Sequence, residues 1–169
     1  METILLTGGG GYIGSHICIP LLEKGYRVKI LDSFINSNPD VITKIKKIFL
    51  LNNKDYHVNL EVFKGDMSDK EFVESVFYKA KNEKKPIDSV IHLAGLKSVS
   101  DSVLDPLSYW DVNVKGTINL LKVMKKFDCP NLIFSSSASI YGNSTKEIVD
   151  ENSSIMPISP YAFTKACIE

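Results

Sequence analysis

The sequence predicts an α/β fold in which helices cover both faces of a parallel β-sheet. Apolar segments of strand length alternate along the chain with amphipathic segments of helix length. The apolar segments lack alternating polar side chains, and such continuous runs are typical of strands buried on both faces. The 169 residues suit one domain, and the 44% hydrophobic and 24% charged residues are ordinary for a globular protein.

The first predicted βαβ unit surrounds the most glycine-rich stretch of the chain. Thr3–Thr7 is an apolar strand, and the amphipathic stretch Gly11–Lys24 is a helix that ends at Gly25, a residue suited to a helix C terminus. Arg27–Asp32 is the second strand and ends on an acidic residue. Residues 33–37 form the loop that follows it.

Capping residues and prolines mark the starts of the remaining helices. A side chain that caps the first turn, followed by proline, indicates a helix start, and Ser-x-x-Glu is a capping box. Hydrophobic spacing of three and four residues supports these assignments. The predicted helices are Pro39–Leu51 after Asn38, a helix opened by the capping box Ser68–Glu71, Pro106–Phe127 with an interruption near Gly116, and Tyr161–Glu169 after Ser159 and Pro160.

Three further apolar runs complete the predicted sheet. They are Leu60–Phe63, Ser89–Gly95 and Asn131–Ser136, while the polar residues 52–59 and 137–158 contain no predicted element. Right-handed crossovers favour the strand order 3-2-1-4-5. A ligand then binds where the order reverses, beyond the carboxyl ends of the first and fourth strands. We therefore predict one Rossmann-type, doubly wound domain over residues 1–169.

The glycine-rich stretch after the first strand fits two phosphate-binding patterns. Gly9, Gly11 and Gly14 fit G-x-G-x-x-G, whereas Gly8, Gly11 and Gly14 fit G-x-x-G-x-x-G. Residues without a Cβ let the backbone approach a phosphate, and the free N–H groups of the helix start bind its charge. The alternative is a flexible glycine-rich turn. The strand before it and the helix after it favour a dinucleotide site.

Asp32 selects the form of the dinucleotide. It stands 18 residues after Gly14, at the end of the second strand, where a carboxylate accepts hydrogen bonds from the adenosine ribose hydroxyls. No arginine follows in residues 33–35 to hold a 2′-phosphate, so NAD is preferred over NADP. The alternative is a turn aspartate at a strand end.

Tyr161 and Lys165 are four residues apart on the last predicted helix and therefore share one face. A nearby ammonium and the positive helix end stabilise the phenolate, whose pKa is ordinarily about 10. Such a tyrosine can accept a proton from a sugar hydroxyl while a hydride leaves the same carbon. Ser137, just past the fifth strand, is a candidate hydrogen-bond partner of that hydroxyl and of Tyr161. The alternative is an exposed helix pair.

Four aromatic or imidazole side chains are predicted to be structural. We expect His92 to pack or form hydrogen bonds inside its strand, and His16 to be structural at its helix start. Tyr109 and Trp110 lie on a helical face and are expected to pack in the core or an interface.

The composition disfavours several other classes of protein. Twenty basic and twenty acidic residues cancel, so no nucleic-acid partner is expected. Cys18, Cys129 and Cys167 show neither zinc spacing nor a disulfide framework, which indicates a reducing compartment and no metal site. No apolar run approaches the ~18 residues of a membrane span, and the first strand begins too early to leave room for a signal peptide. We expect a cytoplasmic protein without a membrane partner.

Five motifs resemble those of the UDP-glucose 4-epimerases, which belong to the extended short-chain dehydrogenase/reductase family. They occur in the family's order and extend over essentially the whole chain. Related 4,6-dehydratases usually carry Thr-Asp-Glu where this chain has three serines, which disfavours them. The motifs are Thr7–His16, His92–Val99, Asn113–Thr117, Phe134–Gly142 and Ser159–Lys165.

The resemblance implies a reaction and a role for each matching residue. The reaction is an isomerisation in galactose metabolism: Tyr161 removes the 4-hydroxyl proton while NAD takes the hydride, and the hydride returns to the other face of the 4-keto sugar. UDP-galactose and UDP-glucose are the implied substrates. Ser137, Tyr161 and Lys165 are the implied catalytic residues. The implied NAD-binding residues are Gly8, Gly11, Tyr12, Ile13, Gly14, Asp32, Asn36, Ser37, Asp66, Met67, Leu93, Ala94, Gly95, Lys97, Asn113, Ser135, Tyr161 and Lys165.

The resemblance also implies that the chain is the N-terminal part of a longer enzyme. The family continues with further strands and a C-terminal domain that binds the UDP-sugar, so the fifth strand is expected at an unprotected edge. We expect little or no epimerase activity from the 169 residues alone, and a homodimer of the full-length protein. The alternatives are another NAD-dependent sugar-nucleotide epimerase or dehydratase, and a non-catalytic NAD sensor. Such sensors commonly lack the tyrosine or the lysine.

Overall fold

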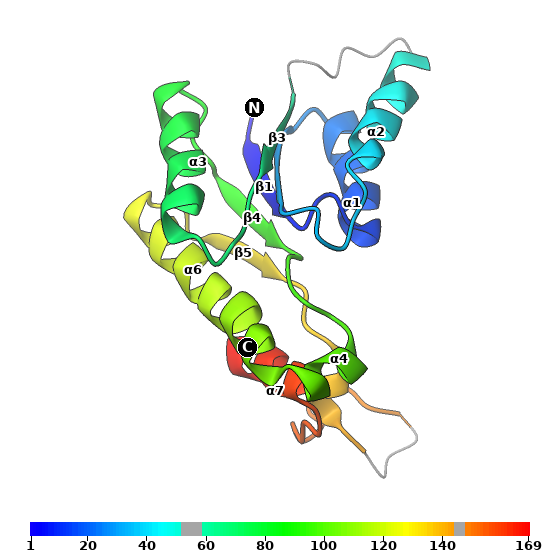
Figure 1. The fold of residues 1–169 in the computed structure, drawn as a ribbon. Helices are drawn as coiled ribbons and strands as arrows, with labels where there is room; N and C mark the ends of the chain where they lie inside the picture. Colours follow the sequence, from blue (N-terminus) through cyan, green and yellow to red (C-terminus); the bar gives the residue numbers. More distant parts are fainter. Residues whose placement is uncertain (52–58, 144–147) are drawn as a thin grey trace.

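Five parallel strands form the sheet at the centre of the computed structural model, which describes residues 1–51, 59–143 and 148–169. Their order is β3-β2-β1-β4-β5, so the predicted Rossmann-type sheet and its strand order are confirmed (Figure 1). The strand β5 lies at one edge, as expected, and its Ile133 side chain is exposed. The strands are β1 (Thr3–Thr7), β2 (Arg27–Asp32), β3 (Leu60–Lys64), β4 (Ser89–His92) and β5 (Asn131–Phe134).

Helices cover the two faces of the sheet and bury its side chains in two clusters. Neighbouring residues of β1 point to opposite faces: Leu6 packs with α1 (Tyr12–Glu23) and α2 (Asp40–Leu51). Leu5 packs with α3 (Lys70–Asn82) and α6 (Gly116–Lys126). Both faces of the central strand are thus fully buried, which explains why the strand sequences lack polar alternation.

The long helical stretch predicted at Pro106–Phe127 is interrupted, as expected, near Gly116. It consists of α5 (Pro106–Tyr109), a π-helix η1 (Trp110–Lys115) and α6. The short helix α4 (Val99–Leu104), capped by Ser98, precedes it and was not predicted. The predicted capping box is also wrong in its first residue, because Asp69 caps α3 by accepting from the Phe72 N–H at 3.0 Å.

The strands β4 and β5 end earlier than predicted, at His92 and Phe134. Gly95 turns the chain out of the sheet with φ +155. A 3-10 helix, η2 (Ala138–Tyr141), lies in the segment predicted to hold no element. Most of the predicted connection 52–59, and residues 144–147, lie outside the described residues.

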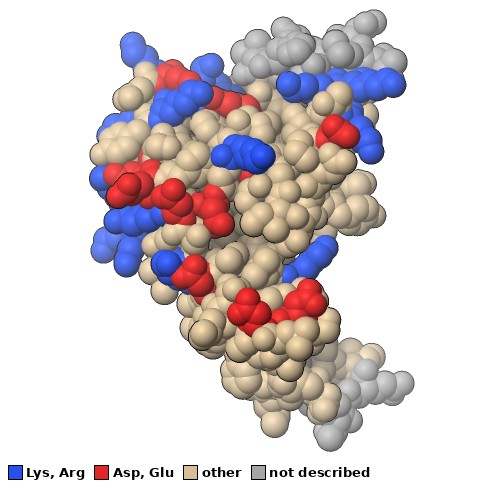
Figure 2. All heavy atoms as spheres, viewed as in Figure 1, with Lys and Arg blue, Asp and Glu red and all other residues tan. Residues whose placement is uncertain are grey.

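The last helix, α7 (Pro160–Ile168), packs against α4, α5 and η1 beyond the sheet rather than on it (Figure 1). Figure 2 shows that basic and acidic side chains are interspersed around the sheet, whereas the protruding part with α4 and α7 carries few charges. Its helices expose apolar side chains, among them Val103, Leu104 and Phe163. Among the described residues, no helix has the length and apolarity needed to cross a membrane.

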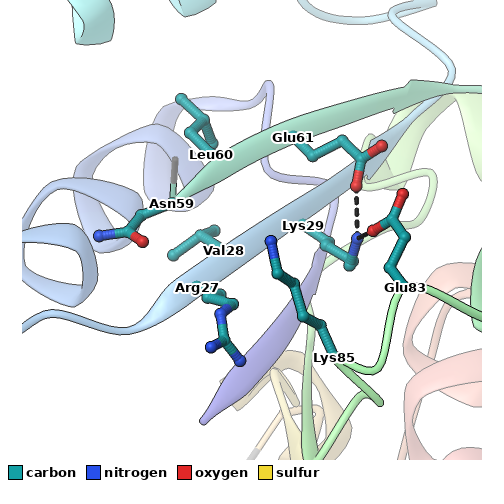
Figure 3. Close-up of a pocket in the computed structure, with 8 residues that line it drawn as sticks. All are labelled: Arg27, Val28, Lys29, Asn59, Leu60, Glu61, Glu83 and Lys85. Carbon is teal, nitrogen blue, oxygen red and sulfur yellow. Dashed lines mark hydrogen bonds and ion pairs between the residues drawn. The ribbon is translucent and has the colours of Figure 1, made fainter. Parts of the chain in front are cut away.

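An ion-pair network joins α3 to β2 and β3 at the amino ends of the strands (Figure 3). Lys29 is 4% exposed. Its ammonium pairs with Glu61 and lies 3.3 Å from the carboxylate of Glu83. Lys79 also pairs with Glu61. Burial opposes the charge of Glu61, but the hydrogen bonds and charges of Lys29 and Lys79 lower its pKa below the ordinary value. A cavity of about 260 Å³ lies beside this network, at the opposite end of the strands from the predicted ligand crevice.

Replacing Glu61 by Gln is therefore expected to lower the free energy of unfolding at pH 7 by about 1–2 kcal/mol. The folded pKa of Glu61 lies below the unfolded one, so its contribution is present above about pH 4.3 and disappears as the pH falls through the folded pKa. Urea unfolding at pH 7 and pH 3 measures this. The exposed Glu151→Gln is the control, and an equal deficit at both pH values would contradict the role of the charge.

Candidate functional site

The loops that follow β1 and β4 meet beyond the carboxyl ends of these strands, where the ligand crevice was predicted. The Leu93 N–H donates to the Thr7 carbonyl at 3.1 Å. Gly8 has φ +70, and a Cβ at this position would stand 2.7 Å from the Ala94 nitrogen. Only glycine allows the two loops to approach this closely.

The glycine loop packs against itself and against the end of β2. A Cβ at Gly14 would stand 2.4 Å from the Gly8 oxygen, so α1 begins directly on the loop. A Cβ at Gly10 would stand 2.6 Å from the Phe34 ring. Neither fingerprint included Gly10, although the run of four glycines was a signal for it. The residues fit a cradle for a backbone-bound phosphate, because the neighbouring backbone excludes side chains at Gly8 and Gly14.

Helix α1 begins without a side-chain cap, unlike α3, α4, α5 and α7. Its N-cap is Gly11, with no side-chain hydrogen bond and no acidic residue in the first turn. In contrast, Asp69 caps α3 and Ser159 caps α7. The first helical residues, Tyr12 and Ile13, are exposed at 78% and 57%. The first turn of α1 thus has no side-chain cap or acidic residue of its own, which fits a pyrophosphate.

Asp32 lies beside this loop, at the end of β2 as predicted. Its carboxylate accepts from the Gly10 N–H and the Phe34 N–H, each at 2.8 Å, and from the Ser37 hydroxyl at 3.2 Å. The structure thus shows Asp32 ordering the glycine loop and the loop after β2, including predicted Ser37. Predicted Asn36 is exposed. Binding of an adenosine ribose by Asp32 stays a prediction.

The remaining predicted cofactor residues differ in their surroundings. Asp66 accepts from the Ser68 N–H at 2.8 Å. Met67 is only 5% exposed and packs in the core, so its side chain does not face an opening. Leu93 is half-buried against the core, and Lys97 is exposed. Whether any of them contacts a cofactor stays a prediction.

The amide of Asn113, predicted to line the cofactor cleft, binds two protein segments. Its Oδ1 accepts from the Leu96 N–H at 2.8 Å, and its Nδ2 donates to the Leu96 carbonyl at 3.0 Å. The Nδ2 also donates to the Thr164 hydroxyl of α7 at 3.1 Å. Asn113 is 3% exposed, so in this structure its amide joins the loop after β4 to α7.

Lys165 and Tyr161 lie on one face of α7, at the end of β5. The Lys165 ammonium donates to the Ser135 carbonyl at 2.9 Å and lies 4.7 Å from the Phe134 ring centroid. It is 6.0 Å from the Tyr161 ring centroid. Burial lowers the pKa of Lys165. The Tyr109 ring packs edge-on against Tyr161 at 6.4 Å, which confirms its predicted packing role.

The structure does not join Ser137 to Tyr161 by a hydrogen bond. The Ser137 hydroxyl instead pairs with the Ser139 hydroxyl at 2.8 Å, and it accepts from the Ser139 N–H as the cap of η2. The sequence could not show this competition, because η2 was not predicted. The neighbouring Ser136 hydroxyl is buried and has no partner among the described residues.

Groups of metal-ligating side chains are absent from the described ranges, and the three cysteines are free. Cys18 and Cys129 are buried and Cys167 is exposed. Burial raises the pKa of Cys18 to about 12, which disfavours a reactive thiolate there.

Comparisons with known proteins show the family of the chain. Residues 5–169 match the sequence family described as GDP-mannose 4,6 dehydratase. The chain belongs to this family. Within it, the chain is UDP-glucose 4-epimerase-like. UDP-glucose 4-epimerase 3 of Oryza sativa subsp. japonica is 40% identical over 167 residues, which are 99% of this chain and 43% of the relative. The UDP-glucose 4-epimerase of Bacillus subtilis is 41% identical over 166 residues, 98% of this chain and 45% of the relative.

Solved structures show the same relationship. A UDP-glucose 4-epimerase from Bifidobacterium longum, in complex with NAD⁺ and UDP, superposes with a TM-score of 0.87 at 38% identity. It covers 99% of this chain, which spans 47% of that structure. One from Stenotrophomonas maltophila, with bound NAD and formylated UDP-arabinopyranose, has a TM-score of 0.87 at 36% identity, covering 99% of this chain and 46% of that one. The epimerase-like chain therefore spans about half the length of these relatives.

Replacing Gly14 by Ala tests the packed glycine loop. The new Cβ meets the Gly8 carbonyl oxygen, which is backbone and cannot turn away, so we expect a loss of about 2 kcal/mol in the free energy of unfolding. Gly116→Ala is the matched control, because it also lies in a helix but its Cβ makes an ordinary 3.4 Å contact with Met67. Urea unfolding measures both. A Gly14→Ala protein as stable as the control would contradict the packing.

Proposed function

We propose that this chain is the NAD-binding part of a UDP-glucose 4-epimerase, which interconverts UDP-galactose and UDP-glucose through a 4-keto sugar. The observation that carries the proposal is that two features lie at the carboxyl ends of the strands. The glycine loop with the uncapped start of α1 lies there, and so does α7 with Tyr161 and Lys165. The relatives named as epimerases, and their structures with NAD, support it.

The chain's own groups supply a binding site that fits NAD. The backbone of Gly8, Gly11 and Gly14 and the first turn of α1, with Tyr12 and Ile13, hold the pyrophosphate. Asp32 accepts from the adenosine ribose hydroxyls, because each carboxylate oxygen can accept more than one hydrogen bond. Of the other predicted residues, Met67 packs in the core and the Asn113 amide joins two protein segments. The rest line the cleft, namely Asn36, Ser37, Asp66, Leu93, Ala94, Gly95, Lys97 and Ser135. Bound NAD supplies the hydride acceptor and donor.

Tyr161 is the base that takes the 4-hydroxyl proton. The Lys165 ammonium beside its ring provides positive charge, and burial strengthens that field because little water screens it. Ser137 donates to the sugar hydroxyl after its own hydroxyl leaves Ser139. The same tyrosine returns the proton, so no net oxidation results.

A second candidate is another NAD-dependent sugar-nucleotide epimerase or dehydratase, because the matched family carries a dehydratase's name. A non-catalytic NAD sensor is disfavoured by the presence of both Tyr161 and Lys165 on one face of α7. The cytoplasmic location and the full-length homodimer stay predictions.

The 169-residue chain is expected to bind one NAD⁺, and to bind NADP⁺ at least tenfold more weakly. The reason is that the 2′-phosphate of NADP⁺ would face the Asp32 carboxylate without a nearby arginine. Isothermal titration calorimetry with each nucleotide measures the two affinities. Equal affinities would contradict the assignment of Asp32, and no binding of either nucleotide would contradict the proposed function.

Replacing Tyr161 by Phe in the complete protein tests the base. We expect kcat for UDP-galactose to fall by a factor of about 100 or more, with NAD still bound, because only the proton acceptor is removed. Tyr109→Phe is the control, since Tyr109 packs against Tyr161 but uses its hydroxyl on the Ser98 carbonyl at 2.6 Å. A coupled assay that detects UDP-glucose reports the rates. Full activity in the Tyr161→Phe protein would refute the catalytic role.

A further inference from the structure

A buried histidine links the end of β1 to the first turn of α6. His92 is the last residue of β4 and is 3% exposed. Its Nδ1 lies 2.6 Å from the Thr7 hydroxyl, and its Nε2 lies 2.9 Å from the Thr117 hydroxyl. Both threonines are buried as well. The predicted structural role of His92 is thus confirmed, and its two contacts are with segments far apart in sequence.

The neighbouring hydrogen bonds determine the protonation of this ring. The Thr117 hydroxyl donates its only hydrogen to the Asn113 carbonyl at 2.6 Å, so it accepts from His92 Nε2–H. The Thr7 hydroxyl accepts from the backbone N–H groups of Leu93 and Ala94, at 3.2 and 3.3 Å, and donates to the bare Nδ1. The two threonine hydroxyls and the ring N–H then each have one acceptor. The neutral Nε2–H tautomer is the form that satisfies all of them.

The chain of hydrogen bonds continues from η1 into α7. Asn113 donates from Nδ2 to the Thr164 hydroxyl, which in turn donates to the Tyr161 carbonyl at 2.7 Å. The buried hydrogen-bond relay thus consists of Thr7, His92, Thr117, Asn113 and Thr164. It runs from the strand that carries the glycine loop to the helix that carries the proposed base.

We propose that His92 is a positioning residue that, as the neutral Nε2–H tautomer, joins the glycine-loop strand to α7 and so sets the distance between the cofactor and Tyr161. This proposal rests on the proposed function, which supplies the two groups that are positioned, the cofactor and Tyr161. Its physical reason is that α7 lies beyond the sheet and has no strand ladder to hold it. Buried hydrogen bonds of fixed direction then act together with its packing against α4, α5 and η1 to determine its placement.

The electrostatic surroundings keep the ring neutral. Burial, and to a lesser extent the charge of Lys165, lowers the pKa of His92 to about 4. The Phe134 ring lies near both groups, with its centroid 5.8 Å from the His92 ring and 4.7 Å from the Lys165 ammonium. A proton on Nδ1 would also face a Thr7 oxygen that already accepts two hydrogen bonds.

The same strand provides a matched control for the relay. Thr3 is fully buried at the other end of β1, but its hydroxyl has no partner among the described residues. Thr3→Val and Thr117→Val therefore make the same chemical change, one outside the relay and one inside it. Thr117→Ser keeps the hydroxyl and is the conservative variant.

The tautomer is read directly by ¹⁵N NMR of the ring nitrogens in the unaltered chain, where only three histidines contribute signals. We expect His92, assigned with His92→Gln, to show a protonated Nε2 and a bare Nδ1, without titration between pH 5.5 and 8. A protonated Nδ1, or titration within this range, would overturn the proposal whether or not NAD binds.

The positioning role is measured in the complete protein. We expect Thr117→Val to lower kcat at least tenfold while the KM for UDP-galactose changes less than twofold, and Thr117→Ser to restore kcat to within threefold. Thr3→Val should leave both constants unchanged. A Thr117→Val protein as active as Thr3→Val would overturn the proposal. If activity survives Tyr161→Phe and the tautomer is the expected one, the proposed function is refuted. The hydrogen-bond relay then has a structural role only.

Discussion

The close approach of the loop after β1 to the loop after β4 is the constraint on which the site depends. Gly8 makes it possible, because any Cβ would overlap the backbone of Ala94. Once the loops touch, Thr7 can accept from the N–H groups of both Leu93 and Ala94. The turn at Gly95 then leads the chain out of the sheet to Asn113, and Asn113 reaches α7. The position of the proposed base therefore depends on the lack of a Cβ at Gly8.

Two buried lysines, one at each end of the strands, differ in the partners of their ammonium groups. Lys29, at the amino ends of the strands, is compensated by the carboxylates of Glu61 and Glu83. Lys165, at the carboxyl end, has no carboxylate partner in the described part of the chain and contacts a carbonyl and aromatic rings. Its positive field remains available to a phenolate and to a bound anion. The ion pairs of Lys29 stabilise the packing of the fold, whereas the unpaired charge of Lys165 suits the stabilisation of a negatively charged group.

The sequence predicted most of the elements, because their signals are local. Glycine at helix ends, proline in first turns and the apolar runs gave the bounds of β1 and β2 and the start of α7. The sequence missed α4 and the 3-10 helix η2, whose short lengths leave no hydrophobic period to detect. It predicted the residues of η1 as helix, but not their π form. It also placed the ends of β4 and β5 two or three residues too late. Leu93 and Ser135, the first residues past the two strands, each still donate one backbone hydrogen bond to the neighbouring strand, so no local signal marks where the pairing ends.

By itself, the sequence determined the fold class, the strand order, the position of the glycine loop at the sheet edge and the shared face of Tyr161 and Lys165. These follow from interactions between residues that are near in the chain, and from the handedness of crossovers. Only the tertiary structure decided which partners the buried polar groups take. The bonds of Thr7 with His92, and of Asn113 with Thr164, join residues 85 and 51 positions apart. No local pattern encodes such pairs, because burial removes water and leaves each donor to the acceptor that packing brings within reach.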